Sequence, residues 1–232
     1  MKKFGIIIFI VTALVGIVFA SFFSFGKVSG KFFSFSLGNS VRGSGQSSSE
    51  IRDVRDFDEV EVGGAFLVEI VAGKDFGVEV EADDNLVPLI RTEVRGGVLR
   101  ISTSKRLKTE NPMRIRVSAP SVESVDASGA SSVSLSTARN RELRIESSGA
   151  SKVQLNGETE LLSVIATGAS NVDAASLRVF DAKVSASGAS HVDVFASRKL
   201  VSDATGASEI KYAGNPTTVE KTSSGASRIH QK

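Results

Sequence analysis

Two aspartates are the residues of this chain best placed to do acid–base chemistry together. Asp173 and Asp193 follow the same short motif in successive copies of a repeat. If those copies stack as neighbouring strands, the two carboxyl groups lie about 5 Å apart, the spacing of the acid and the nucleophile in a retaining glycosidase. The alternative is a solvated charged face, because no part of the sequence builds a cleft around the pair. Asp173 and Asp193 are therefore the candidate catalytic residues of a carbohydrate-active enzyme, and we favour the non-catalytic alternative.

Other kinds of site lack the residues that they require. The chain has no Cys and only two His, at positions 191 and 230, so we expect no metal site and no cofactor. No Gly-x-Ser-x-Gly elbow and no glycine-rich phosphate loop occurs. The 28 Lys and Arg nearly balance the 26 Asp and Glu, for a net charge of +2. A chain without a basic excess is not expected to bind nucleic acid.

The candidate pair belongs to a repeat that fills the second half of the chain. Gly-Ala-Ser occurs six times, about every 19 residues, and a period of this length must be interpreted before any single motif. Its glycines are Gly129, Gly149, Gly168, Gly188, Gly206 and Gly225. We call the residue three positions after each glycine Gly+3, and name the other positions in the same way.

Alternation around each glycine predicts strands. Gly+4 is always β-branched and apolar, namely Val133, Val153, Val172, Val192, Ile210 and Ile229. Even positions are apolar or small and odd positions are polar, which is the period of a β-strand. One strand pass per ~19 residues, with like residues stacked, is typical of a parallel β-solenoid. The fold class is therefore all-β, with the small residues around each glycine marking a turn.

The odd positions form outward ladders that are the candidate binding surface. Gly+3 and Gly+5 share one face, and their side chains vary from coil to coil. The candidate binding residues are Lys152, Asp173, His191, Asp193, Glu209, Lys211 and Arg228. A surface glycan or a protein is the expected partner of these ladders.

The chain before the repeat divides into an export segment, a linker and an atypical start of the domain. Lys2 and Lys3 precede an uncharged apolar run, 4–23, so residues 1–23 are either a signal peptide or a transmembrane anchor helix. Both alternatives place the rest of the chain in the cell envelope, and an uncleaved segment would bind the membrane. Residues 24–50, rich in Phe, Gly and Ser, are expected to be a flexible linker. Residues 51–232 form the solenoid domain, atypical over 51–118 and regular over 119–232.

Several segments of the first part resemble a known family. Phe57 is followed by Glu59-Val60-Glu61-Val62-Gly63-Gly64-Ala65-Phe66, and then come Asp83-Asp84-Asn85-Leu86, Thr92-Glu93-Val94, Leu99-Arg100-Ile101 and the serial Ser-Gly-Ala-Ser units. In this order they resemble the putative auto-transporter adhesin, head GIN domain family, from about Phe57 onward. The resemblance implies a right-handed parallel β-helix, exported, without an established activity and without functional residues to transfer.

Adhesion or surface scaffolding by a non-enzymatic envelope protein is the function that these observations favour. The alternatives are the carbohydrate-active enzyme with Asp173 and Asp193, and a membrane-tethered sensory or accessory domain held by residues 4–23. The aliphatic pattern weakens in the last two coils, where Ser202 and Lys221 occupy Gly−4. We therefore expect the last coil to be the least stable, with strand edges open to edge-to-edge self-association.

Overall fold

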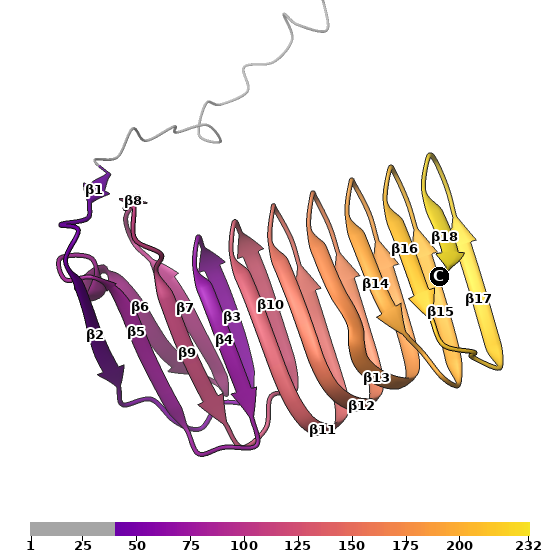
Figure 1. The fold of residues 1–232 in the computed structure, drawn as a ribbon, viewed down its shortest axis with the longest axis horizontal. Helices are drawn as coiled ribbons and strands as arrows, with labels where there is room; N and C mark the ends of the chain where they lie inside the picture. Colours follow the sequence, from indigo (N-terminus) through magenta and orange to yellow (C-terminus); the bar gives the residue numbers. More distant parts are fainter. Residues whose placement is uncertain (1–39) are drawn as a thin grey trace, which may run out of the picture. The chain divides into compact units, whose positions relative to one another are not determined.

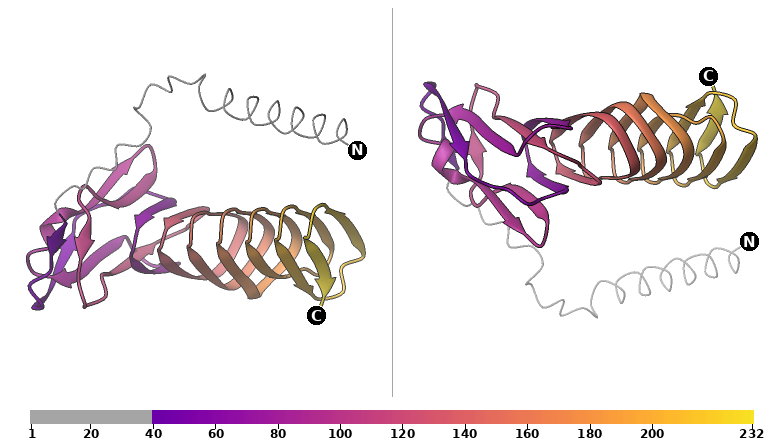
Figure 2. Two further views of the ribbon diagram at one scale, coloured as in Figure 1. Left: turned by 90° about the horizontal axis from the view of Figure 1, so that it is seen from above. Right: turned by 90° about the horizontal axis from the view of Figure 1, so that it is seen from below.

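The computed structural model describes residues 40–232, which form an elongated coil of β-strands (Figure 1, Figure 2). One 3-10 turn, η1 (Val87–Leu89), is the sole helical element of this part. Its strands are β1 (Val41–Arg42), β2 (Ser47–Arg52), β3 (Glu59–Gly64), β4 (Leu67–Ala72), β5 (Gly77–Asp83), β6 (Ile90–Arg95), β7 (Val98–Thr103), β8 (Leu107–Lys108), β9 (Arg114–Ala119), β10 (Ser124–Gly129), β11 (Ser132–Ser147), β12 (Lys152–Ala166), β13 (Asn171–Ala186), β14 (His191–Phe195), β15 (Lys199–Ala204), β16 (Glu209–Ala213), β17 (Thr218–Ser223) and β18 (Arg228–Gln231).

Each coil contributes one strand segment to each of two faces. The downstream face consists of the segments that follow the repeat glycines: the first halves of β11, β12 and β13, then β14, β16 and β18, with β4 and β9 before them. The upstream face consists of the segments that precede the glycines: β10, the second halves of β11, β12 and β13, then β15 and β17, with β3 and β7 before them. All of these pairings are parallel, so the predicted β-solenoid is confirmed.

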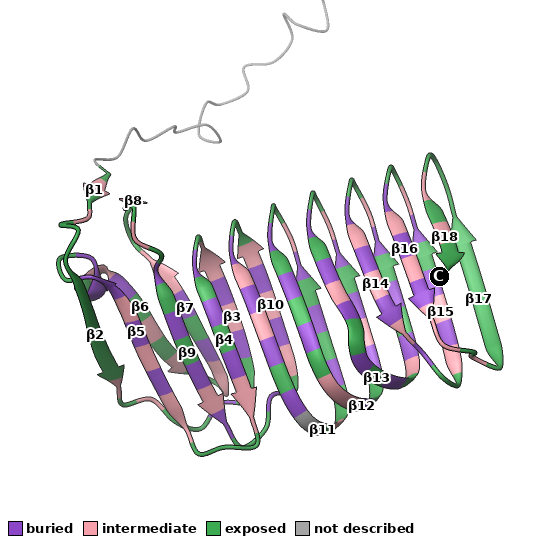
Figure 3. Ribbon diagram, in the orientation of Figure 1, coloured by how far each residue is buried: buried purple, intermediate pink, exposed green. Residues whose placement is uncertain are grey.

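Register along the downstream face follows the aliphatic ladder that the sequence predicts. Val133 pairs with Val153, and the pairing continues in register to Ile229. The ladder from Val133 to Ile210 is at most 1% exposed, and buried residues alternate with more exposed ones along strands such as β12 and β13 (Figure 3). Burial of stacked aliphatic side chains supplies the main stabilisation of the coils.

The repeat glycines form a tight turn that only glycine fits. Gly149 has a φ of +72°, in the left-handed region. A Cβ atom at this position would lie 2.8 Å from the carbonyl oxygen of Gly129, one coil away. The N–H of Ala150 donates to that same oxygen at 2.8 Å. The glycines themselves are exposed, so the expectation that every even position points inward is wrong at the turn, where the backbone leaves the extended conformation.

The serine of the motif is buried and satisfies backbone carbonyl groups. Ser151 is 1% exposed, and its hydroxyl lies 2.9 Å from the oxygen of Ser148 and 3.1 Å from that of Ala127. Ser170, Ser190 and Ser208 are equally buried. All four of these serines reach a carbonyl oxygen of an earlier coil, and Ser151 and Ser208 also reach one in their own turn. Since an unpaired buried carbonyl is costly, these contacts stabilise the stacked turns.

In the N-terminal part the order of strands in space differs from their order in the sequence. β3 lies between β7 and β10, and β4 lies between β9 and β11 (Figure 1). The chain thus leaves the coil after β4, builds β5 to β9 beyond it, and returns beside β3. β6 and β7 form an antiparallel hairpin through Gly96 and Gly97, both with positive φ.

The expected linker, 24–50, contains strand near its end, where β1 and the first four residues of β2 lie. β2 pairs antiparallel with β5, from Ser47 opposite Asp83 to Arg52 opposite Val78. The serine-rich composition indicated flexibility, but an extended backbone needs no apolar side chains to add a strand to an open sheet edge. The expected signal or anchor helix, 1–23, and residues 24–39 lie outside the described residues. Within residues 40–232 no helix is long and apolar enough to cross a membrane.

Candidate binding face

The outward ladders of the downstream face lie in the register that the sequence predicts. At Gly+5, Gln154, Asp173, Asp193, Lys211 and His230 are consecutive register partners. At Gly+3, the same holds for Lys152, Asn171, His191, Glu209 and Arg228. Because neighbouring strands lie about 4.8 Å apart, side chains on adjacent coils can contact one another directly.

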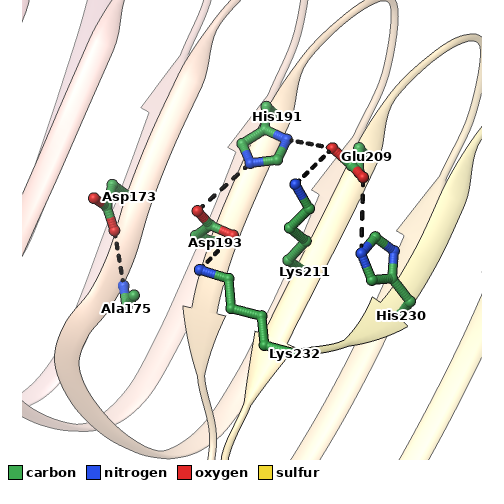
Figure 4. Close-up of polar contacts among 8 residues, drawn as sticks. All are labelled: Asp173, Ala175, His191, Asp193, Glu209, Lys211, His230 and Lys232. Carbon is green, nitrogen blue, oxygen red and sulfur yellow. Dashed lines mark hydrogen bonds and ion pairs between the residues drawn. The ribbon is translucent and has the colours of Figure 1, made fainter.

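The two candidate catalytic aspartates are neighbours, but each has partners of its own (Figure 4). Asp173 accepts a hydrogen bond of 3.1 Å from the backbone N–H of Ala175. Asp193 forms ion pairs with His191, at 3.5 Å, and with Lys232, at 3.1 Å. Both carboxylates lie on an outward strand face and are engaged in local contacts. Strand stacking therefore makes the two carboxyl groups neighbours, and each is held by a different partner.

Glu209 is the centre of a cationic shell. Its carboxylate lies 3.0 Å from Nδ1 of His191, 3.1 Å from Nζ of Lys211 and 3.8 Å from Nε2 of His230 (Figure 4). The hydrogen bond from Lys211 is the main cause that lowers the pKa of the Glu209 carboxyl, and the charges of Lys211, His191 and His230 add to it against the cost of burial. Glu209 is therefore ionised at neutral pH.

His191 joins two coils through both of its ring nitrogens. Nε2 faces Asp193 on its own strand and Nδ1 faces Glu209 on the next coil. A neutral imidazole has one N–H donor, and only the imidazolium has two. The two contacts can therefore both be hydrogen bonds only when His191 is protonated.

The seven candidate binding residues fall into two groups. The structure brings His191, Asp193, Glu209 and Lys211 into one network, with His230 and Lys232 added. Lys152, Asp173 and Arg228 stay outside it. Although Arg228 is the register partner of Glu209, among residues 40–232 neither it nor Lys152 has an ion pair. The network balances its own charges, so the side chains best able to meet a ligand are those outside it.

A carboxylate ladder on the upstream face is missing from the sequence-based candidates. Asp126 is the register partner of Glu61 on one side and of Glu146 on the other. Burial raises the pKa of the Asp126 carboxyl, and the charges of Glu146 and Glu61 raise it further. Asp126 and Glu146 share the Gly−3 position, so alignment on the repeat glycines contained the signal. Glu61, which is paired with Arg100 at 2.9 Å, lies three residues before Gly64, the register partner of Gly129, so it occupies the equivalent position in β3.

Within residues 40–232 no three His, Cys, Asp or Glu side chains are grouped so that they could hold a metal ion. His191 and His230 both contact Glu209, because that residue lies on the coil between them. His191 and His230 thus participate in an ion-pair network.

Comparison with known proteins identifies the class to which this fold belongs. A family model described as "Putative auto-transporter adhesin, head GIN domain" matches residues 56–216. The chain belongs to this family, as the resemblance of its motifs indicated. A comparison with curated proteins finds no match.

Solved structures of bacterial proteins share this fold, and three of them illustrate the likeness. A putative adhesin from Bacteroides fragilis is 21% identical, with a TM-score of 0.67, and the match covers 83% of this chain and all of that one. A putative lipid binding protein from Parabacteroides distasonis is 18% identical, with a TM-score of 0.52, covering 84% of this chain and all of the other. A putative adhesin from Parabacteroides merdae is 16% identical, with a TM-score of 0.53, covering 84% of this chain and 99% of the other. At these identities the likeness establishes the fold.

Proposed function

We propose that this chain is a non-catalytic, exported cell-envelope protein whose solenoid binds a surface glycan or a protein through its downstream face. Membership of a family described as an adhesin supports a role in surface attachment. The apolar run 4–23, after Lys2 and Lys3, supports export, as an anchor or as a cleaved signal. A regular array of outward side chains suits a repetitive or extended partner, as in other solenoids.

The observation that carries the proposal is the way in which the carboxylates of this face are held. Asp193 and Glu209 are neutralised by neighbouring cations, and Asp173 accepts a backbone N–H. Within the Gly+3 and Gly+5 ladders, Lys152 and Arg228 remain as the cations without an ion pair among the described residues. These two side chains are therefore the contacts that we assign to the partner, with Asp173 beside them.

Attachment of the full chain to bacterial or host surfaces and to a glycan array tests this proposal. We expect Lys152→Glu combined with Arg228→Glu to lower attachment by about tenfold, since exposed charges steer association and complement a partner. The matched control is Lys183→Glu, because Lys183 is an exposed lysine on the upstream face, on β13. Equal loss in both variants, or no loss in either, would refute the assignment of the binding face.

A further inference from the structure

A group of cations lies at the N-terminal end of the solenoid, away from the candidate binding face. Its members are Arg42 on β1 and Lys105, Arg106 and Lys108 in and before β8, and we call them the basic patch. β1 and β8 are parallel partners, with Val41 opposite Leu107 and Arg42 opposite Lys108. The N–H of Val41 donates to the oxygen of Arg106 at 2.9 Å, and that of Gly43 to the oxygen of Lys108 at 2.8 Å.

Strand alternation directs these cations outward. Val41 and Leu107 are half-buried against the hydrophobic core. In a strand, residues next to each other point to opposite sides, so Arg42, Arg106 and Lys108 point away from the core. All three are exposed, and Lys105 is exposed at the preceding turn. The Thr103 hydroxyl accepts from the N–H of Lys105 and donates to its carbonyl oxygen, which orders that turn.

The basic patch is poorly neutralised by its own surroundings. Of the four cations of the basic patch, Arg42 alone has an ion pair with a residue in the described range 40–232, and its partner is the exposed Glu110 at 4.0 Å. Asp84, the other exposed carboxylate close to this segment, accepts from the Ser44 hydroxyl and from the N–H of Asn85. Arg42 and Lys108 are like charges in direct register, which costs stability in a sheet. An anionic partner would offset this repulsion.

The sequence on the N-terminal side of the basic patch favours a membrane as the anionic partner. Seventeen residues separate Phe23, the end of the apolar run, from Val41, which pairs with the basic patch. Even fully extended, this connection spans only about 60 Å, and Phe32, Phe33 and Phe35 lie within it. Basic residues close to a membrane-inserted segment are attracted to anionic lipid, and a hydrophobic segment combined with a basic cluster anchors more firmly than either alone.

We propose that the basic patch contacts anionic phospholipid headgroups, so that the N-terminal end of the solenoid rests on the membrane surface. The inference rests on the proposed export and on residues 4–23 remaining attached as an anchor. Membrane contact at this end leaves the candidate binding face, on β12 to β18, toward the opposite end of the solenoid.

Lysine acetylation of the full chain, read by mass spectrometry, tests the contact. The chain is reconstituted with vesicles of phosphatidylcholine alone or with added phosphatidylglycerol. With the anionic vesicles we expect acetylation of Lys105 and Lys108 to slow at least about threefold, and to recover when salt screens the charges. Lys183, exposed on β13 far along the coil, is the internal control and should react equally on both vesicles.

Each other outcome overturns a defined part of the account. A chain that associates with neither vesicle refutes the anchor, and with it the membrane contact. A chain that associates with both vesicles but shows no difference at Lys105 and Lys108 refutes the contact alone and leaves the proposed attachment function intact. Protection by soluble polyphosphate but not by anionic vesicles would assign the basic patch to an anionic polymer instead, which also refutes the proposal. A Lys105→Glu and Lys108→Glu variant should lose the preference of the chain for anionic vesicles while keeping its association with phosphatidylcholine.

Discussion

The repeat coils, 124–213, and the N-terminal part, 59–119, hold their strands in register by different means. In the repeat coils, identical positions stack, with aliphatic side chains such as Val172 inside and glycines at one turn. In the N-terminal part, parallel and antiparallel strands mix, and specific pairs such as Arg116 with Glu79 and Glu81 join neighbouring strands. In the repeat coils, the same side chain at the same position of every coil sets the strand register. In the N-terminal part, which has no such repetition, individual polar contacts are needed to set it.

The largest effect is expected from a charge placed inside the repeat coils. Val172 is fully buried between Val153 and Val192. Val172→Asp should lower the free energy of unfolding by about 4 kcal/mol, because it buries an unpaired carboxylate. The control is Val201→Asp, since Val201 is half-exposed between Lys183 and Glu220 and should cost less than about 1 kcal/mol. Urea unfolding followed by circular dichroism measures both, and similar losses would contradict the assigned register.

A pair of glycine substitutions separates close stacking from backbone conformation. Gly149 and Gly73 both have positive φ, but a Cβ at Gly149 would meet the Gly129 backbone, whereas a Cβ at Gly73 has open space around it. We expect Gly73→Ala to cost about 1 kcal/mol from its φ alone. Gly149→Ala should cost about 3 kcal/mol, because the neighbouring coil must also move. Thermal unfolding of the two variants gives the comparison, and equal costs would show that stacking is unimportant.

The N-terminal part should contribute to the fall of the unfolding free energy at acid pH, through Asp83. Hydrogen bonds from Asn111 and Thr109 lower the pKa of the buried Asp83 carboxyl, as does the N–H of Gly45. A lowered folded pKa stabilises the fold above the unfolded pKa of about 3.9, and this contribution is lost as pH falls through the folded value. Asp83→Asn should therefore flatten the acid limb of the unfolding free energy.

The Asp181 carboxyl of the repeat coils is a matched control for Asp83, because the two should respond differently to added salt. Arg198 lowers the pKa of the Asp181 carboxyl, and this ion pair is partly exposed. The contribution of Asp181 should shrink when salt is added, while that of Asp83, held by neutral donors, should persist. Denaturation at several pH values, with and without salt, measures both, and an Asp83 contribution that disappears in salt would contradict the role of neutral donors.

Much of the repeat half could be predicted because its signal recurs. Each Gly+4 side chain confirms the one before it, so the strand period, the parallel register and the outward ladders all follow from alignment on glycine. The order of β3 between β7 and β10 could not, since these partners are far apart in the sequence and no period connects them. The pairing of β2 was hidden for a related reason, because its backbone, rather than its serine side chains, supplies the contact with β5.

For the candidate binding face, the sequence predicted which residues lie on neighbouring coils, but it did not predict which side chains contact one another. The ladders place His191 next to Glu209 and His230 one coil further on. They do not predict that both imidazoles face the same carboxylate, because side-chain direction depends on packing around each strand. Lys232 and its ion pair with Asp193 lay beyond the reach of the repeat pattern altogether.

The central claim, that the face carrying Asp173 and Asp193 binds without catalysing, is tested most directly by turnover of polysaccharides. Full-length wild type and an Asp173→Asn and Asp193→Asn double variant are incubated with a panel of bacterial and host polysaccharides, and released reducing ends are measured. We expect no cleavage by either protein, and for the variant a folded state with a stability within about 1 kcal/mol of wild type. Cleavage of any polysaccharide by the wild type that falls by orders of magnitude in the double variant would contradict the account.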